Sequence, residues 1–260
     1  MLLATWNVNS LTARLPRVLE FLERHRPAAL CLQETKVSAE AFPHDALAAA
    51  GYAAADHSGG RWAGVAVLAP VGDPPHKPAR GLPGEPEPEQ ARWVEATVAG
   101  VRVVSVYVPN GRAPDTPPFA SKLAFLRAMA GRARSLAASP AVLMGDMNVA
   151  LADADVYDPA AFDGATHVTP AERAALEGVL ASGFADAHRS LHPDAAGFTW
   201  WDYRQGHFHR GLGMRIDLAL LSPSLLAGLR RCEIDRDFRR GPKPSDHAPL
   251  LVEVDLLAGV

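Results

Sequence analysis

The sequence predicts an α/β or mixed α+β fold. Short apolar, β-branched runs alternate along the chain with longer segments of helical periodicity, as in proteins whose helices pack against sheets. The chain has 260 residues, a length at which folding buries roughly 70 to 75% of the unfolded surface. Two Pro- and Gly-rich stretches, 71–88 and 110–118, are predicted to be surface loops and lack the composition of an interdomain linker. We therefore expect a single domain over residues 1–260.

Eight segments are expected to form strands, because each is a short apolar run that includes β-branched or other large apolar residues. One of these runs contains Cys31, which we expect to lie in the core. In chain order, the predicted strands are residues 2–8, 28–33, 64–69, 92–98, 101–108, 141–145, 215–220 and 250–254.

Four further segments are expected to form helices. The last of them has the clearest start signal. Thr169 can cap the helix, Pro170 suits its first position, and Glu172 lies three residues after the cap, where it can complete a capping box. The predicted helices are residues 14–25, 43–50, 119–136 and 170–182.

Composition excludes several classes of protein. A content of 48% hydrophobic and 21% charged residues is typical of a water-soluble globular chain, not of a disordered, collagen-like or coiled-coil protein. The only two cysteines, Cys31 and Cys232, are too few for a disulfide framework, which favours a reducing compartment. No apolar run approaches the length of a transmembrane helix, and no basic leader precedes the first strand. We therefore expect a cytoplasmic protein with no membrane partner.

Charge is distributed unevenly along the chain. The formal net charge of −3 excludes a protein that coats nucleic acid over its whole surface. Residues 229–243, however, hold six basic and three acidic side chains, a local charge of +3. A solvated surface of mixed charge and a local nucleic-acid-binding face are both compatible with this count.

Several apolar runs end abruptly in a carboxylate, an amide or a histidine. The ends of strands are where α/β enzymes carry their chemistry. A single residue of this kind is most often a turn former or a helix cap, so it is the set as a whole that carries information. Its members are Asn7, Asn9, Gln33, Glu34, Tyr107, Asn110, Asp146, Asn148, Asp217, Asp246 and His247.

Asp217 stands out because it lies within the apolar run from Ile216 to Leu220, where a carboxylate needs an arginine, a metal or a histidine as its partner. His247 is a candidate partner. Its neighbour Asp246 points to the opposite face if this segment is extended, so the two residues should have different partners. A histidine held by a separate buried acid forms a dyad, and a separate cluster of Glu, Asp and Asn is typical of a Mg²⁺ site.

This set of residues suits phosphodiester hydrolysis. A divalent ion neutralises the phosphate, an acid orients or deprotonates water, and a histidine and amides stabilise the pentacoordinate transition state. The sequence contains no Gly-x-Ser-x-Gly elbow, no Gly-rich phosphate loop before Lys-Ser/Thr and no dinucleotide fingerprint. Acyl transfer and nucleotide-cofactor chemistry are therefore not favoured.

Six motifs, in order along the chain, resemble those of the exonuclease III family. This family is the abasic-site (AP) endonuclease branch of the endonuclease/exonuclease/phosphatase superfamily. The resemblance extends from Thr5 to Val254, essentially the whole chain. The motifs are WNVN (6–9), LQETK (32–36), VYVPNG (106–111), GDMN (145–148), GMRID (213–217) and PSDHAP (244–249).

The resemblance implies a four-layered α/β sandwich, in which two mixed β-sheets face each other, helices cover the outside, and the site lies at one edge. It also implies a Mg²⁺-dependent DNA repair nuclease, with Mn²⁺ as an alternative ion. Such an enzyme cuts duplex DNA 5′ of an abasic site and removes 3′-terminal nucleotides or 3′-blocking groups. We expect duplex DNA as the partner and a monomeric enzyme.

The resemblance also implies roles for individual residues. Glu34 is then the principal Mg²⁺ ligand, with Asn7, Asn9 and Asp246 in or near the metal shell. Among the catalytic residues, Asp146 orients and activates the attacking water, Asn148 and Tyr107 contact the phosphate, and Asp217 holds His247 against the phosphate oxygens. The residues assigned to the substrate are Asn9, Asn110, Trp200, Met214 and Ile216. Arg210 is a separate candidate for DNA contact, because it lies in a loop, 205–211, that departs from the family's pattern.

An abasic nucleotide is usually recognised by flipping its sugar into an apolar pocket. We expect Trp200, Met214 and Ile216 to form that pocket, and one of the adjacent pair Trp200 and Trp201 to be an ordinary core residue. The basic side chains expected to contact phosphates are Arg14, Arg17, Lys36 and Lys122, together with those of residues 230–243.

Two alternative functions stay open. One is a superfamily phosphodiesterase or phosphatase that acts on RNA, nucleotides or phospholipid headgroups. The other is a non-catalytic nucleic-acid-binding regulator on the same fold. Every proposed catalytic position carries a chemically competent residue, which favours the nuclease.

Overall fold

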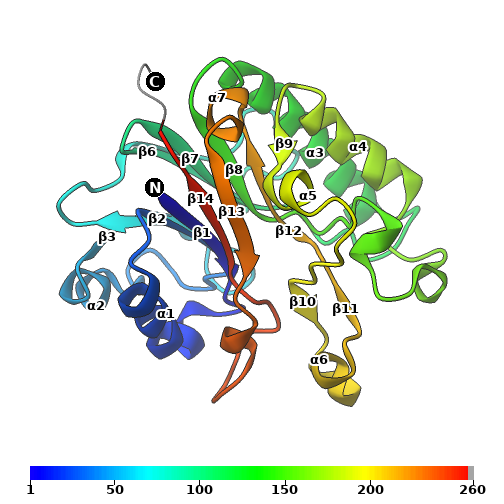
Figure 1. The fold of residues 1–260 in the computed structure, drawn as a ribbon, viewed down its shortest axis with the longest axis horizontal. Helices are drawn as coiled ribbons and strands as arrows, with labels where there is room; N and C mark the ends of the chain where they lie inside the picture. The colour runs from blue at the N-terminus through cyan, green and yellow to red at the C-terminus, as the bar shows by residue number, and fades with distance from the viewer. Residues whose placement is uncertain (257–260) are drawn as a thin grey trace.

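Two six-stranded sheets face each other, and helices cover their outer faces (Figure 1). This computed structural model describes residues 1–256. The four layers confirm the fold class that was predicted from the sequence. None of the helices within residues 1–256 is both long enough and apolar enough to span a membrane.

The first sheet combines the N-terminal strands with the last strand of the chain. Its order is β13-β14-β1-β2-β4-β3, with β1 and β2 parallel and the other neighbours antiparallel. Its strands are β1 (Leu2–Asn7), β2 (Ala29–Gln33), β3 (Tyr52–His57), β4 (Val65–Pro70), β13 (Leu229–Ile234) and β14 (Leu250–Val254).

The second sheet has the order β5-β6-β7-β8-β12-β9, and only β7 and β8 are parallel. A separate two-stranded sheet pairs β10 (Trp200–Trp201) with β11 (Gly213–Met214). The strands of the second sheet are β5 (His76–Arg80), β6 (Trp93–Val98), β7 (Val101–Tyr107), β8 (Ala141–Asp146), β9 (Ala185–Asp186) and β12 (Asp217–Leu221).

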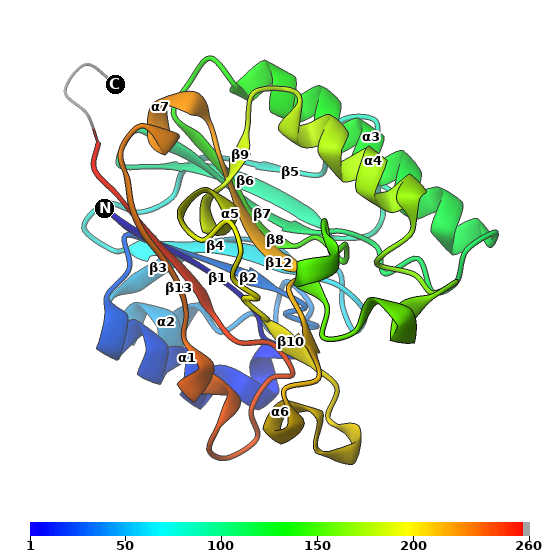
Figure 2. The ribbon, with the colours of Figure 1, turned by 45° about the vertical axis from the view of Figure 1, so that its right-hand side comes forward.

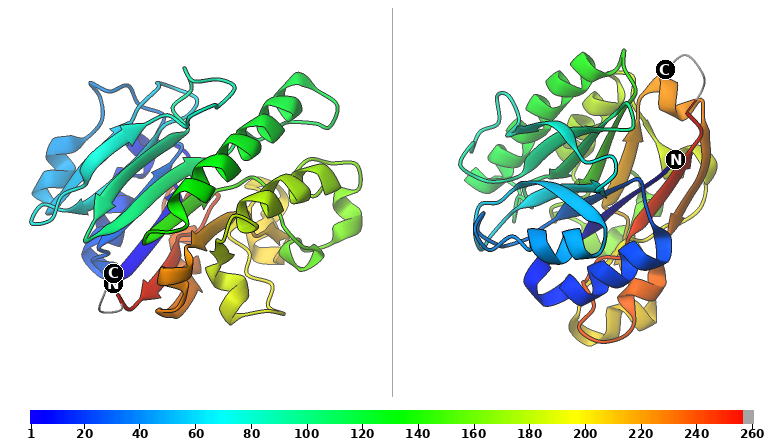
Figure 3. Two further views of the ribbon diagram at one scale, coloured as in Figure 1. Left: turned by 90° about the horizontal axis from the view of Figure 1, so that it is seen from above. Right: turned by 90° about the vertical axis from the view of Figure 1, so that its left-hand side faces the viewer.

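Helices α1 (Leu11–His25) and α2 (His44–Ala49) cover the first sheet, and α3 (Pro117–Leu136) and α4 (Pro170–Leu180) lie side by side on the second (Figures 2 and 3). Short helices α5 (Ala187–Leu191), α6 (His207–Arg210) and α7 (Pro223–Leu226) lie in the connections of the second half, together with single 3₁₀ turns at Asp153–Asp155, Pro159–Phe162, Arg204–Gly206 and Arg236–Arg239.

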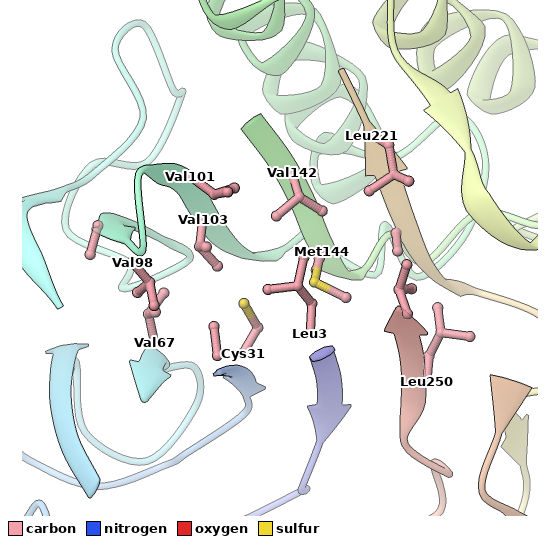
Figure 4. Packing of buried hydrophobic residues seen from close by; sticks show 14 of the residues in the cluster. Leu3, Cys31, Val67, Val98, Val101, Val103, Val142, Met144, Leu221 and Leu250 are labelled. Atoms are coloured by element: carbon pink, nitrogen blue, oxygen red, sulfur yellow. The ribbon is translucent and has the colours of Figure 1, made fainter. Parts of the chain in front are cut away.

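The main core lies between the two sheets. Side chains from both sheets point toward one another there, including Leu3 and Cys31 from the first sheet and Val142 and Met144 from the second (Figure 4). Residues next to them along the same strands, such as Leu143, pack against the outer helices instead. Because both faces of these strands are covered, they are apolar at nearly every position, which is why the sequence predicts them well.

All eight predicted strands and all four predicted helices are present, with ends that differ by a few residues. The capping box at the start of α4 is also confirmed, since Thr169 and Glu172 exchange hydrogen bonds. The interpretation of 71–88 as loop is wrong in part, because β5 lies within it. The sequence HKPAR of β5 is mostly exposed at a sheet edge and therefore lacks an apolar pattern.

Strand register brings the predicted polar residues to one edge of the sandwich. In the second sheet, Tyr107 at the end of β7 pairs with Asp146 at the end of β8, and Asp146 pairs with Asp217 at the start of β12. In the first sheet, Asn7 at the end of β1 lies beside Gln33 at the end of β2. The ends of the parallel pairs β1–β2 and β7–β8 and the start of the antiparallel strand β12 therefore meet at the same edge.

Candidate active site

A cavity of about 210 Å³ opens at this edge. Ten of the residues that line it belong to the set predicted from the sequence, and His167 is the one that was not predicted. Asn7 and Asp217 lie directly behind it, each hydrogen-bonded to a lining residue. The lining residues are Glu34, Tyr107, Asn110, Asp146, Asn148, His167, Trp200, Met214, Ile216, Asp246 and His247.

Asp217 and His247 form a buried dyad. The Asp217 Oδ2 atom lies 2.7 Å from His247 Nδ1, which leaves Nε2 toward the cavity, 3.8 Å from Asp146 Oδ2. Thr199 Oγ1 accepts hydrogen bonds from the backbone N–H groups of Ile216 and Asp217, which fixes the start of β12. Burial alone would lower the pKa of His247, but the Asp217 carboxylate raises it to about 10, so the imidazole is a cation at neutral pH.

Asp146 is held at the centre of the site by two hydrogen bonds. Its Oδ1 accepts from the Asn148 N–H at 2.9 Å, and its Oδ2 accepts from Asn7 Nδ2 at 2.9 Å. Burial raises the pKa of Asp146 to about 7, an effect opposed by the His247 cation and reinforced by Asp217 and Glu34. A carboxylate with a pKa near neutrality is suited to accept a proton from water.

The glycine before Asp146 is required by the close contact of β8 with β7. A Cβ atom on Gly145 would lie 1.9 Å from the carbonyl oxygen of Val106. This close contact explains why the first residue of the GDMN motif is glycine, since any side chain there would separate the two strands.

The carboxylate of Glu34 faces both amide and cationic neighbours. Its Oε1 accepts from Asn7 Nδ2 at 2.8 Å, and its Oε2 pairs with Lys36 Nζ at 2.6 Å. Glu34, Asp146 and His247 each offer a ligand atom, and these atoms lie within 4.8 Å of one another. Two oxygen donors that converge on one cavity fit a hard divalent cation. Since the His247 ring is already protonated, Glu34 and Asp146 are the donors best suited to it.

The other predicted metal ligands have different neighbours. Asn7 directs its Nδ2 group to both carboxylates, and its Oδ1 accepts from the Asn9 N–H. Asp246 accepts from Asn9 Nδ2 and Trp200 Nε1, both at 3.1 Å. Within residues 1–256, the close group of acidic and histidine ligand atoms therefore includes Glu34 but not Asp246. As predicted, Asp246 and His247 have separate partners.

Tyr107 and Asn148 provide polar groups on the wall beside Asp146. Burial, together with the charges of Glu34 and Asp146, raises the pKa of Tyr107 well above its usual value, so its hydroxyl keeps its proton. Asn148 donates from Nδ2 to the Val108 carbonyl at 2.9 Å, and its Oδ1 accepts from Asn110 Nδ2 at 3.3 Å. Both residues can present hydrogen-bond donors to an anionic substrate.

The apolar wall of the cavity consists of Trp200, Met214 and Ile216. Met214 and Ile216 are buried, and half-buried Trp200 packs against them. Trp201 is fully buried, which confirms that one of the two tryptophans is a core residue.

His167 is the cavity residue that sequence reasoning missed. Its Nδ1 lies 2.6 Å from the Asn148 carbonyl oxygen, and its Nε2 lies 3.5 Å from Asn110 Nδ2. Burial and the nearby Lys122 cation lower the pKa of His167 to about 4, so it is neutral. His167 lies in the connection before α4 and does not follow the end of a strand. No sequence pattern therefore distinguishes it from a surface histidine.

Comparison with known proteins places this site in a family. A model described as the Endonuclease/Exonuclease/phosphatase family matches residues 4–247. The chain belongs to this family. The resemblance that rests on six motifs is thereby confirmed.

Several relatives of this family member align over nearly its whole length. Exodeoxyribonuclease III of Haemophilus influenzae is 32% identical, covering 96% of this chain and 98% of the relative. The 3′ phosphatase NExo from Neisseria, solved with a product DNA hairpin, is 39% identical with a TM-score of 0.95, covering 98% and 99% of the two chains. An AP endonuclease from Archaeoglobus fulgidus is 35% identical with a TM-score of 0.94, again covering 98% and 99%. The family member described here is a phosphodiester hydrolase.

The basic residues expected to contact the substrate differ in their exposure and in their distance from the cavity. Lys122 does not face solvent, because it is completely buried and paired with Glu172. Its prediction as a phosphate contact is therefore wrong. Arg210 is exposed on α6, which extends away from the body of the protein beside β10 and does not line the cavity (Figure 1). Arg14 donates to Tyr203 Oη and to the carbonyl of Asn9, next to the cavity.

Proposed function

We propose that this chain is a Mg²⁺-dependent DNA repair nuclease. It hydrolyses the phosphodiester bond 5′ of abasic sites and removes 3′-terminal nucleotides or 3′-blocking groups from duplex DNA. The observation that carries the proposal is the arrangement of Asp146 between the Asp217–His247 dyad and the Glu34 carboxylate at one cavity. The names of the aligned relatives, an exodeoxyribonuclease, a 3′ phosphatase and an AP endonuclease, support DNA as the substrate.

In this proposal each group has one task. Asp146 accepts the proton of the attacking water, since its carboxylate faces the cavity and has a pKa near neutrality. The His247 cation, held by Asp217, faces the phosphate oxygens and stabilises the charge that develops on them. The Tyr107 hydroxyl and Asn148 orient the same phosphate. Glu34, with Asp146, would hold the divalent ion, and Asn7 and Asp246 are proposed to lie in or near its shell. The ion neutralises phosphate charge when bound.

The substrate side of the proposal rests on the remaining residues. The apolar wall of Trp200, Met214 and Ile216 would face the sugar at the cleavage site. Asn9 and Asn110 would contact DNA near the cavity, and Arg210 would contact it farther out. We also propose that the enzyme acts as a monomer, since one copy of the chain brings both carboxylates and the Asp217–His247 dyad to a single cavity. The proposed DNA substrate and the two unpaired cysteines support the cytoplasm as its location.

Strand cleavage on two duplexes tests the proposal. One duplex carries a single internal abasic analogue, and the other is intact with a recessed 3′ end. We expect cleavage of at least one with Mg²⁺ or Mn²⁺ and complete loss of cleavage with a chelator, because the two carboxylates need a cation to approach a phosphate. The ratio of the two rates measures the balance of endonuclease and 3′-end activity. Folded protein that binds both duplexes but cleaves neither would favour the non-catalytic regulator.

The pH dependence of kcat/KM is expected to be bell-shaped. Asp146 must lose its proton to act as a base, so activity rises with pH through a pKa that is about 7 without metal. His247 must keep its proton, so activity falls as pH rises through about 10. A divalent ion beside Asp146 stabilises its carboxylate and moves the acid limb below pH 7. Initial rates between roughly pH 5 and 10.5 would measure both limbs, and a flat profile would contradict these roles.

A further inference from the structure

A buried ion pair lies directly behind the cavity. Lys122 of α3 is completely buried, and its Nζ pairs with Glu172 of α4. The same Nζ group donates to the carbonyl oxygens of Asn148 at 2.7 Å and Asn110 at 3.1 Å. One cation therefore contacts the backbone of two residues that line the cavity.

The carboxylate of Glu172 completes the connection to a third segment. Its Oε1 accepts from Thr166 Oγ1 at 2.7 Å and from the His167 N–H at 2.9 Å, and its Oε2 accepts from the Thr169 N–H at 3.1 Å. The pair thus joins the loop after β7, the loop after β8 and the segment before α4. These three segments supply Asn110, Asn148 and His167 to the cavity wall.

Backbone conformation at these residues explains why such a connection is needed. Asn148 has φ 50° and His167 has φ 80°, in the left-handed region that costs free energy for residues other than glycine. Next to Asn110, Gly111 has φ 84°, and a Cβ there would lie 2.8 Å from Lys122 Cδ. Such conformations persist only where surrounding contacts hold them.

A contribution to the stability of the fold does not by itself explain why an ion pair occupies this buried position. Removing two charges from water is costly, and well-packed apolar residues often replace a buried pair without loss of stability. If the ion pair instead serves to position the cavity residues next to it, its removal should lower the rate of the reaction at the cavity.

We propose that Lys122 and Glu172 are positioning residues that hold the backbone of Asn110, Asn148 and His167 in the geometry needed to orient the reacting phosphate in the transition state. The proposal rests on the proposed function of the site. It places no group of the pair in contact with substrate.

Three variants test it on whichever of the two duplexes the wild type cleaves faster: Lys122→Met, the double variant Lys122→Met/Glu172→Gln, and Thr166→Val. The double variant leaves no buried charge unpaired and should melt at a higher temperature than Lys122→Met. Thr166→Val keeps both charges of the ion pair and removes only the hydroxyl that connects Glu172 to the segment before α4. This variant is therefore expected to fold even if the double variant does not. We expect kcat to fall at least about tenfold in the double variant, with KM changed by less than about threefold, because a misplacement of about 1 Å can cost about 10²-fold in rate.

Glu95→Gln is the matched control. Glu95 is also a buried carboxylate paired with a residue of α3, Arg132, yet neither lines the cavity. It should lower the melting temperature and leave kcat unchanged when all proteins are assayed well below their melting temperatures.

The outcomes separate the two proposals. A wild-type protein that cleaves neither duplex would overturn the proposed function itself. An active wild type whose double and Thr166→Val variants keep kcat within about twofold of the Glu95→Gln control would overturn the positioning role and leave the nuclease in place.

Discussion

Asp146→Ala is expected to lower kcat for DNA cleavage by about 10³-fold or more while the protein stays folded. The substitution removes the group proposed to accept the proton of the attacking water. It also removes one of the two carboxylates that would hold the cation. Because both losses act on the same step, the effect should exceed that of either task alone.

The folded state should tolerate this change well. The pKa of Asp146 is raised in the folded protein, so its carboxyl contributes stability below the unfolded value near 3.8, and that contribution is lost as pH rises through about 7. At pH 8 the charged, buried carboxylate therefore gives the fold less stability than the protonated carboxyl does at low pH. The melting temperature of Asp146→Ala should then equal or exceed that of the wild type.

Single-turnover cleavage and thermal melting at pH 8 measure the two effects together. Glu89→Ala is a suitable control, since Glu89 is an exposed carboxylate in the loop before β6 that neither lines the cavity nor lies in the basic segment expected to contact DNA. A variant at Asp146 with more than about a tenth of wild-type kcat would rule out this residue as the base.

How far the sequence predicts the molecule depends on burial. Strands β1, β8 and β12 are covered on both faces and read as apolar runs, so their positions follow from the sequence. Edge strands β5 and β13 carry exposed charged residues, and nothing in their composition separates them from loops. Their pairing is decided by contacts with distant parts of the chain.

The residues of the site likewise fall into those that the sequence predicts and those that it does not. Glu34, Asp146 and Asp217 could be identified because they respectively follow, end and begin a strand that reaches the common edge. His167 could not, since a long connection brings it to the cavity. The burial of Lys122 could not be predicted either, because its partner Glu172 lies 50 residues away and a lysine on a helix is normally solvated.

Asp217→Asn is expected to lower kcat by roughly 10² to 10⁴-fold, although Asp217 does not touch the substrate. The amide has nearly the same shape as the carboxylate but no charge. Burial would then lower the pKa of His247 against only the smaller opposing effects of the Asp146 and Asp246 charges, so the imidazole would lose its proton at a lower pH than in the wild type. The basic limb of the pH profile should therefore move from near 10 to lower pH.

The double variant Asp217→Asn/His247→Gln decides whether the two residues act as one unit. If Asp217 acts only through His247, its replacement in the His247→Gln background should change kcat by less than about threefold, because the imidazole whose charge it maintains is already absent. NMR titration of the His247 ring in the single Asp217→Asn variant would follow the pKa directly. Losses that multiply in the double variant, or a His247 pKa that stays near 10, would show that Asp217 acts by another route.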